Sequence, residues 1–323
     1  MLENLSKRAN LFRIWEIIEQ NDNFLLTLHP SPDLDSICSN YVMLHLLKNR
    51  GKSAVLISGD NFNPGQFSFI PEFISEIENK NIFEKRFDAL LALDISRPER
   101  ISANLTITGE EKFNLINIDH HLNNSFSDNV YLDVEASSTC EIIFLLAQIN
   151  NLELSDKMLQ ALYLGMYDDT AGFTLQTSSN TLFFAGEIKG RTAIDGVITV
   201  AKKQWTLADL NILPKIISNY TVENIYGVSV GILVTEEKFE IKKLQNFLSS
   251  QKEEIIIIST KEEYFRIEII CWLPVEKAVA RKIAEKLNGG GHANRAGGKE
   301  LILTNVSEIK NKIISATKEV LVP

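Results

Sequence analysis

Short apolar runs alternate with longer amphipathic segments as far as about residue 180. The apolar runs have the length of buried strands and lie at residues 24–28, 53–58, 87–93 and 113–118. The amphipathic segments have helical spacing and lie at residues 36–49, 137–149 and 155–167. Because strands that alternate with helices form parallel sheets, the pattern predicts an α/β domain with a mostly parallel sheet.

The pattern weakens near three glycines in the middle of the chain and then starts again. The later part predicts strands at residues 228–234, 255–259, 264–272 and 300–303, and helices at 239–249, 276–288 and from 307 onward. A chain of 323 residues is long enough for two hydrophobic cores. We therefore expect an N-terminal domain at residues 1–185, a linker at 186–218, and a smaller C-terminal α/β domain at 219–323.

The balance of acidic and basic residues limits the kinds of molecule that the protein is expected to bind. The chain has 33 Lys and Arg residues against 42 Asp and Glu residues, a formal net charge of −9. Long duplex nucleic acid and anionic membranes both need a basic surface, so neither is an expected partner. Metal cations or a small anionic substrate remain compatible with this balance.

The cysteine content and the hydropathy of the chain bear on the cellular compartment in which the protein is expected. Three scattered cysteines, Cys38, Cys140 and Cys271, are too few for a disulfide framework. Residues 1–19 have no continuous signal-peptide core, and no apolar run reaches the roughly 20 residues of a membrane span. We expect a reduced, cytoplasmic protein.

Acidic and histidine residues gather where the predicted strands end. The first strand runs into a segment with His29, Asp33 and Asp35; the third ends at Asp94; and the fourth ends in Asp119, His120 and His121. The helix at 155–167 is followed by Asp168 and Asp169. In an open parallel sheet, ligands bind outside the carboxyl ends of the strands, so these side chains should meet at one edge.

Several carboxylates at one edge repel one another unless cations separate them. Asp with His, and without Cys, suits manganese, iron or zinc, and the ligands suffice for two ions. A two-metal site favours in-line displacement at phosphorus, so the residues predict a phosphoesterase. Taken singly, Asp94 is more typical of a turn or a helix cap, and Asp33 and Asp35, which lie beside prolines, are more typical of a turn.

These segments, in this order, resemble the motifs of the DHH phosphoesterase superfamily. The segment from His29 to Asp35 is similar to its first motif, Asp94 to its second, and Asp119-His120-His121 to the signature that names it. Ser138-Thr139 with Glu141 and the segment 165–170 are similar to the later motifs. The resemblance spans nearly the whole chain.

The resemblance implies a role for each matching residue. It implies two Mn²⁺ ions, one held by His29, Asp33 and Asp94, and the other by Asp35, Asp94, His120 and Asp169. Asp119 would orient His120 or His121, and His121 would face the substrate phosphate or the leaving oxygen. A hydroxide bridging the two metals would attack phosphorus.

The C-terminal domain carries a glycine-rich run that resembles the motif of the DHH-associated domain. Its expected substrate-binding residues are Gly289, Gly290, Gly291 and His292, because glycine backbones approach a phosphate closely. Arg295 within that run and Arg100 after Asp94 are further candidates, although each could be a surface charge. The alternative for the glycines is a helix C-cap after Asn288. The active site would lie in a cleft between the domains.

The subgroup of nanoRNases and pAp (3′-phosphoadenosine 5′-phosphate) phosphatases is the most similar. It implies a manganese-dependent hydrolase of small phosphoesters, either short oligonucleotides or pAp-like nucleotides, and leaves a homodimer open. Residues 269–272 lack the arginine that this subgroup usually has there, so the substrate stays open. Two alternatives remain: a manganese-dependent inorganic pyrophosphatase, and a nucleotide-binding regulatory module with little or no turnover.

Overall fold

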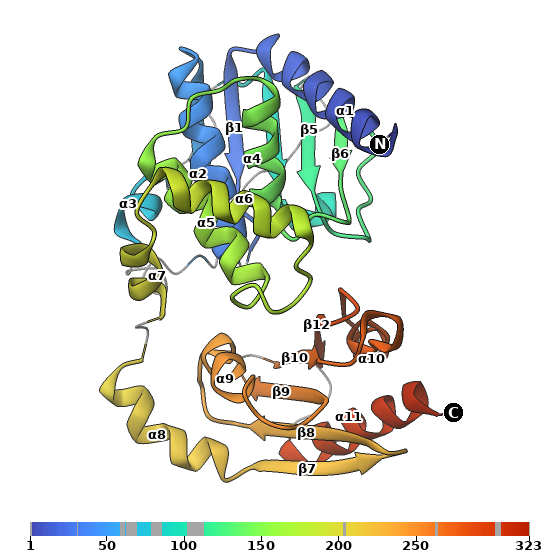
Figure 1. The fold of residues 1–323 in the computed structure, drawn as a ribbon. Helices are drawn as coiled ribbons and strands as arrows, with labels where there is room; N and C mark the ends of the chain where they lie inside the picture. Colours follow the sequence, from blue (N-terminus) through green and yellow to red (C-terminus); the bar gives the residue numbers. More distant parts are fainter. Residues whose placement is uncertain are drawn as a thin grey trace. The chain divides into compact units, whose positions relative to one another are not determined.

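The computed structural model describes residues 2–30, 32–58, 62, 70–78, 86–101, 113–202, 205–261, 264–300 and 305–322. The chain divides into two compact units, Met1–Lys203 and Gln204–Pro323. Each unit has a six-stranded sheet, and each is described by itself (Figure 1).

The sheet of the first unit is parallel throughout, in the order β3-β2-β1-β4-β5-β6. Its strands are β1 (Asn23–Thr27), β2 (Ser53–Ile57), β3 (Ile77–Glu78), β4 (Ala89–Leu93), β5 (Asn114–Asp119) and β6 (Val130–Leu132). This sheet confirms the predicted α/β class. Strands β3 and β6 were not predicted, because runs of two or three residues carry no measurable period.

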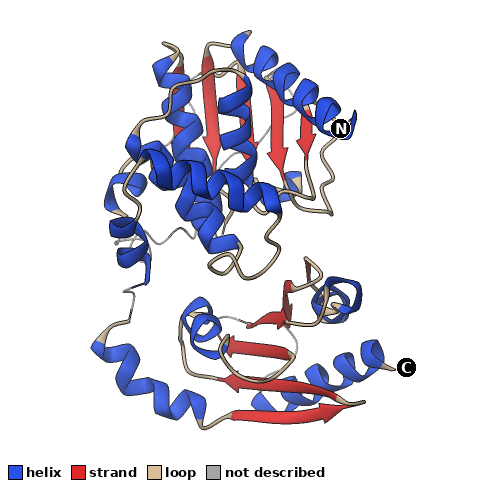
Figure 2. Ribbon diagram, viewed as in Figure 1, coloured by secondary structure: helices blue, strands red, loops and turns tan. Residues whose placement is uncertain are grey.

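Helices pack on the sheet of this unit or on one another (Figure 2). They are α1 (Leu2–Glu19), α2 (Leu34–Asn49), α3 (Pro71–Ile74), α4 (Thr139–Ile149), α5 (Asp156–Asp169), α6 (Ser179–Arg191) and α7 (Asp195–Lys202). No helix was predicted at α1. Its signal is nevertheless present, because the buried residues Leu11, Ile14, Trp15 and Ile18 recur at helical spacing.

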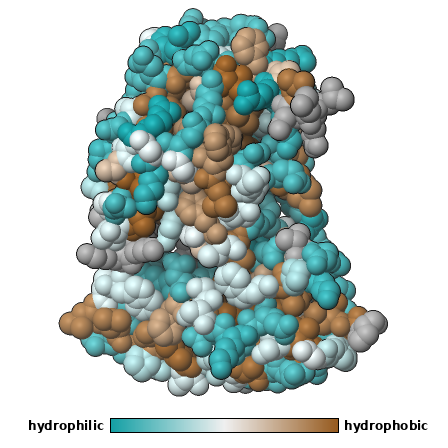
Figure 3. Space-filling model, in the orientation of Figure 1, coloured by the Kyte–Doolittle hydropathy of each residue, from teal (hydrophilic) through white to brown (hydrophobic). Residues whose placement is uncertain are grey.

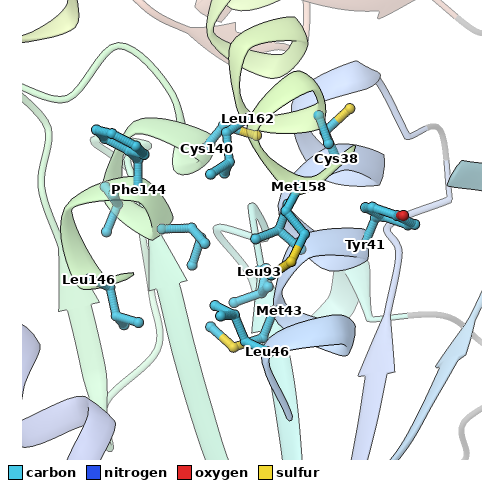
Figure 4. Close-up of a cluster of buried hydrophobic side chains, with 14 of the residues drawn as sticks. Cys38, Tyr41, Met43, Leu46, Leu93, Cys140, Phe144, Leu146, Met158 and Leu162 are labelled. Carbon is cyan, nitrogen blue, oxygen red and sulfur yellow. The ribbon is translucent and has the colours of Figure 1, made fainter. Parts of the chain in front are cut away.

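The main core of the first unit lies between the sheet and α2, α4 and α5. Figure 4 shows side chains from these helices, among them Met43, Phe144 and Leu162, packed around Leu93 of β4. All four side chains are fully or almost fully buried. This core fixes the helices against the strands whose carboxyl ends carry the candidate site.

The sheet of the second unit is mixed, in the order β11-β12-β10-β9-β8-β7, and only β8 and β9 pair in parallel. Its strands are β7 (Tyr220–Ile225), β8 (Val228–Thr235), β9 (Ile255–Lys261), β10 (Phe265–Cys271), β11 (Gly290–Gly291) and β12 (Arg295–Glu300). Its helices are α8 (Leu207–Ile217), α9 (Ile241–Leu248), α10 (Ala280–Lys286) and α11 (Val306–Leu321). The second α/β domain is therefore confirmed.

Several predicted boundaries in this unit were wrong. Strand β7 was missed, since its residues are mostly half-exposed and carry little apolar signal. The helix predicted at 276–288 is only α10, preceded by a short 3-10 turn at Val275–Lys277. Strand β12 begins at Arg295, inside the glycine-rich run where no strand was predicted. Residues 301–303 of the strand predicted at 300–303 lie outside the described residues.

The predicted linker at 186–218 is mostly helical. It contains the end of α6, all of α7 and all of α8. The division between the two compact units falls at Lys203, within this stretch.

The surface mixes hydrophilic and hydrophobic side chains on the face shown in Figure 3. The most exposed large apolar residues are Leu207 on α8 and Phe183 on α6. Among the described residues, no helix combines the length and the apolar composition that crossing a membrane requires.

Candidate metal centre

Three neighbouring strands deliver polar side chains to one edge of the first sheet. His29 lies two residues beyond β1, Asp94 directly follows β4, and Asp119 is the last residue of β5. Strand β4 pairs with both β1 and β5, so these carboxyl ends are adjacent. All three side chains are buried. The structure thus brings together residues that are 90 positions apart in the sequence.

The start of α2 adds two carboxylates with different surroundings. Asp33 caps the helix and accepts a hydrogen bond from the Ser36 N–H at 3.1 Å. Asp35 in the first turn is fully buried. Its Oδ2 accepts from the Thr139 N–H at 2.7 Å and its Oδ1 from the Cys140 N–H at 2.8 Å. The N-terminus of α4 therefore holds the Asp35 carboxylate through two backbone amides.

Gly165 lets α5 approach this carboxylate closely. A Cβ added at Gly165 would lie 2.3 Å from the Cys140 Sγ and 3.0 Å from the Asp35 Oδ1. Any side chain larger than hydrogen would therefore push against the residues that hold Asp35.

Asp94 lies at the centre of the cluster. Its Oδ2 is 3.8 Å from His29 Nε2, and its Oδ1 is 3.5 Å from His120 Nε2. The Thr139 hydroxyl donates to the same Oδ1 at 3.3 Å. The two oxygens of one carboxylate thus face two different histidines.

Burial is the largest influence on the pKa values of the Asp94 and Asp35 carboxylates. Burial first, and then the charge of Asp33, raise the pKa of Asp94 to about 6 against the pull of His120 and His121. Burial, followed by the charges of Asp94 and Asp169, raises the pKa of Asp35 well above its ordinary value. Both shifts disfavour the ionised carboxylates, so a bound cation would be favoured beside them.

His120 lies among three carboxylates. Its Nε2 is 3.3 Å from Asp169 Oδ2, 3.5 Å from Asp94 Oδ1 and 4.0 Å from Asp35 Oδ2. Burial lowers the pKa of His120, but the nearby carboxylates of Asp169 and Asp94 outweigh it and hold this pKa well above the usual range. Asp169, the last residue of α5, is brought to the cluster as the sequence predicted.

Asp119 pairs with His121 rather than with His120. His121 Nδ1 lies 2.7 Å from Asp119 Oδ1, and the Asn124 amide donates to Asp119 Oδ2 at 2.8 Å. Burial raises the pKa of Asp119, but these hydrogen bonds and the two histidines lower it to about 2. Burial and His120 lower the pKa of His121, and Asp119 and Asp94 raise it above the ordinary value overall.

The donor set fits divalent cations. In each of two groups, His29 with Asp33 and Asp94, and Asp35 with Asp94 and His120, the ligand atoms lie within 4.8 Å of one another. Oxygen and imidazole nitrogen donors of this kind suit manganese, iron or zinc. Buried carboxylates with raised pKa values, sharing one site, also need a counter-charge. The residues therefore fit a metal centre, and Asp94 belongs to both groups.

Arg100, one of the predicted substrate-binding residues, lies beside the cluster. It ends a short 3-10 helix at Pro98–Arg100, and its Nη2 is 3.3 Å from His29 Nδ1. Arg100 is therefore more than a solvated surface charge.

The glycine-rich run belongs to the second unit, with His292 and Arg295. A Cβ at Gly289 would lie 1.9 Å from the carbonyl oxygen of Gly297, and one at Gly291 would lie 2.7 Å from the Cα of Ala296. These two glycines are thus required by the close approach of β11 to β12, a packing reason that sequence analysis did not consider. Substrate binding by Gly289, Gly290, Gly291, His292 and Arg295 stays a prediction.

Two asparagines near the cluster were missed by sequence analysis. Asn117 lies within β5 and is fully buried, and Asn124 lies in the loop that follows. Asn124 donates from Nδ2 to Asn117 Oδ1 at 2.7 Å. The available signal was a polar residue in the middle of an otherwise apolar strand.

The chain is similar to known proteins over most of its length. Residues 23–166 match the DHH family, N-terminal domain. The chain is 24% identical over 326 residues to the "Bifunctional oligoribonuclease and PAP phosphatase NrnA" of Mycoplasma genitalium, and the alignment covers 97% of this chain and 99% of that protein.

Two solved structures share the fold. An exopolyphosphatase-related protein from Bacteroides fragilis has a TM-score of 0.78 and 23% identity, with 96% of each chain covered. RecJ from Thermus thermophilus, in complex with Mn²⁺, has a TM-score of 0.53 and 13% identity over 97% of this chain and 55% of RecJ.

Proposed function

We propose that this chain, whose residues 23–166 match the DHH family, N-terminal domain, is a metal-dependent hydrolase of short oligoribonucleotides and pAp-like nucleotides. The observation that carries the proposal is the position of Asp94. One buried carboxylate belongs to two groups of ligand atoms, and its two oxygens face His29 and His120 respectively. A carboxylate shared in this way suits a two-metal centre.

The proposed ligands form two sets that share this carboxylate. One ion would be held by His29, Asp33 and Asp94, and the other by Asp35, Asp94, His120 and Asp169. Two bound divalent ions would supply a nucleophile at neutral pH and neutralise charge that develops on the phosphoryl oxygens. Manganese is the proposed metal, since the donors suit it and RecJ, which shares the fold, is described with Mn²⁺.

His121 and Asp119 would act together on the substrate. The ionised Asp119 fixes Nδ1 of His121 as a hydrogen-bond donor, which places the second ring proton on Nε2. The raised pKa of His121 favours retention of that proton. We propose that His121 donates from Nε2 to a phosphate oxygen or to the leaving oxygen.

Charge and similarity both favour short substrates. A net charge of −9 does not suit an extended groove for a long strand. The M. genitalium relative is named for oligoribonuclease and PAP phosphatase activity, and nearly its whole length aligns. A cytoplasmic location is proposed because all three cysteines are free thiols and buried.

A substrate panel tests the proposal. The chain is stripped of metal with a chelator, reloaded with Mn²⁺, and incubated with a diribonucleotide, pAp and inorganic pyrophosphate. Mononucleotide release, or phosphate release from pAp, supports the proposal. Turnover of pyrophosphate alone would favour the pyrophosphatase alternative. Tight binding of a nucleotide without any turnover would favour the regulatory module.

A further inference from the structure

We propose that Asn117 is a positioning residue that holds Asp94 in the backbone conformation required by both of its ligand groups. This inference rests on the proposed function of the metal centre. Asn117 lies in the middle of β5 and belongs to neither ligand group, so it acts through Asp94.

The Asn117 amide spans the turn that carries Asp94. Its Nδ2 donates to the carbonyl of Ala92 at 2.8 Å and to the carbonyl of Ile95 at 2.9 Å. These carbonyls lie on either side of Asp94 in the sequence. Both amide protons of a fully buried side chain are thus used on one short segment.

That segment has an unfavourable backbone geometry. Asp94 has φ of +59°, in the left-handed region, which is unfavourable for a residue other than glycine. Such a conformation persists only where its surroundings determine it. Here the Asp94 N–H donates to the carbonyl of Ile118 at 3.1 Å, and Asn117 holds the carbonyls on both sides.

The turn decides where the carboxylate lies. Strand β4 ends at Leu93, and a residue that continued the strand would alternate its side chain with the pleat. The backbone instead takes a left-handed turn at Asp94. In this conformation one oxygen of the Asp94 carboxylate lies near His29 and the other lies near His120. Loss of the Asn117 amide would release this turn and widen the distribution of carboxylate positions.

The Asn117 side chain also connects the turn at Asp94 to the pair formed by Asp119 and His121. Asn117 Oδ1 accepts from Asn124 Nδ2, which also donates to Asp119 Oδ2. Asp119 in turn holds His121. A continuous line of hydrogen bonds therefore connects the turn at Asp94 to the imidazole proposed to act on the substrate.

The test compares two asparagines of one strand. Asn117→Ala removes the amide that spans the turn. Asn114→Ala is the control, because Asn114 begins β5 and donates to Asn21 Oδ1 at 2.9 Å, at the opposite end of the strand. Mn²⁺ stoichiometry and affinity are measured by calorimetry and by electron paramagnetic resonance of free Mn²⁺, and stability by urea denaturation of the metal-free protein.

We expect Asn117→Ala to weaken Mn²⁺ binding by about 10- to 100-fold, while Asn114→Ala binds as the wild type does. If Asn117→Ala does not fold, it is replaced by Asn117→Thr, which keeps one hydrogen-bond donor and a similar side-chain volume. This variant should also bind Mn²⁺ more weakly than the wild type.

Two results would overturn the inference in different ways. A variant that loses stability in urea but binds two Mn²⁺ ions with wild-type affinity would show that Asn117 only satisfies buried carbonyls. A wild-type protein that binds no Mn²⁺ would contradict the proposed function itself, and the inference would fail with it.

Discussion

His121 Nδ1 lies 2.7 Å from Oδ1 of Asp119, a buried carboxylate at the end of β5. The pKa of Asp119 is about 2 despite its burial, so the carboxylate is ionised and the imidazole donates. This pair links the proposed metal ligands to the group proposed to act on the substrate.

Asp119→Asn should lower the pKa of His121, because the replacement removes the charge that raises it. We expect kcat to fall by roughly 10²- to 10⁴-fold, as is usual when a general acid loses its correct protonation state. The His121 titration is followed by NMR in the metal-free protein and kcat is measured with Mn²⁺. An unchanged His121 pKa would contradict the role given to Asp119.

The stability of the metal-free protein should fall as pH rises. The folded pKa of Asp94 is about 6 against an ordinary value of 3.8, so its contribution is fully present below pH 3.8 and is lost as pH rises through 6. The shift corresponds to at most about 3 kcal/mol. Asp35 and His120 are shifted upward too and act in the same direction.

Urea denaturation at pH 4 to 8, with a chelator present, measures this dependence. Asp94→Asn is the control, since it keeps the shape of the side chain and removes the titration. The wild type should lose more stability across this range than the variant, and Mn²⁺ should restore it. Parallel pH profiles for the two proteins would refute the raised pKa of Asp94.

Gly165→Ala should destabilise the first unit by about 1–3 kcal/mol, because the added methyl group would meet the Cys140 Sγ. Cys140→Ala removes that sulfur, so the double variant should recover part of the loss. Urea denaturation of the four proteins gives the coupling energy. Strictly additive effects would mean that the contact between these two positions is not the cause.

Thr139→Val should weaken Mn²⁺ binding, on the order of tenfold, because it removes the hydroxyl that donates to Asp94 and keeps the N–H that donates to Asp35. Thr139→Ser retains the hydroxyl and should bind Mn²⁺ nearly as the wild type does. Calorimetric titration distinguishes the two. Equal affinities in the valine and serine variants would remove any role for the hydroxyl.

Much of the site could be predicted because its residues directly follow recognisable strands. Asp94 and Asp119 come at the ends of apolar runs, and the edge where parallel strands end is the same for all of them. The choice between His120 and His121 as partner of Asp119 was left open. Side chains two apart in an extended chain share one side, and this period favours His121, as the structure shows.

The rest depends on contacts that no local pattern encodes. The backbone hydrogen bonds from the N-terminus of α4 to the Asp35 carboxylate connect positions that are more than 100 residues apart in the sequence. The role of Asn117 depends on the left-handed turn at Asp94, which a sequence does not display for an aspartate. The glycines before His292 were assigned to phosphate binding, whereas the approach of β11 to β12 already requires two of them.

Asp94 is proposed as a ligand shared by two metal ions that promote hydrolysis of a short phosphoester. The most direct measurement is the rate of mononucleotide release from a diribonucleotide, with and without Mn²⁺, for the wild type and for Asp94→Asn. The account predicts Mn²⁺-dependent release by the wild type and a loss of at least about 10³-fold in the variant, which keeps the shape of the side chain but not its charge. Release by Asp94→Asn at the wild-type rate, or release by the wild type that does not depend on any divalent cation, would contradict it.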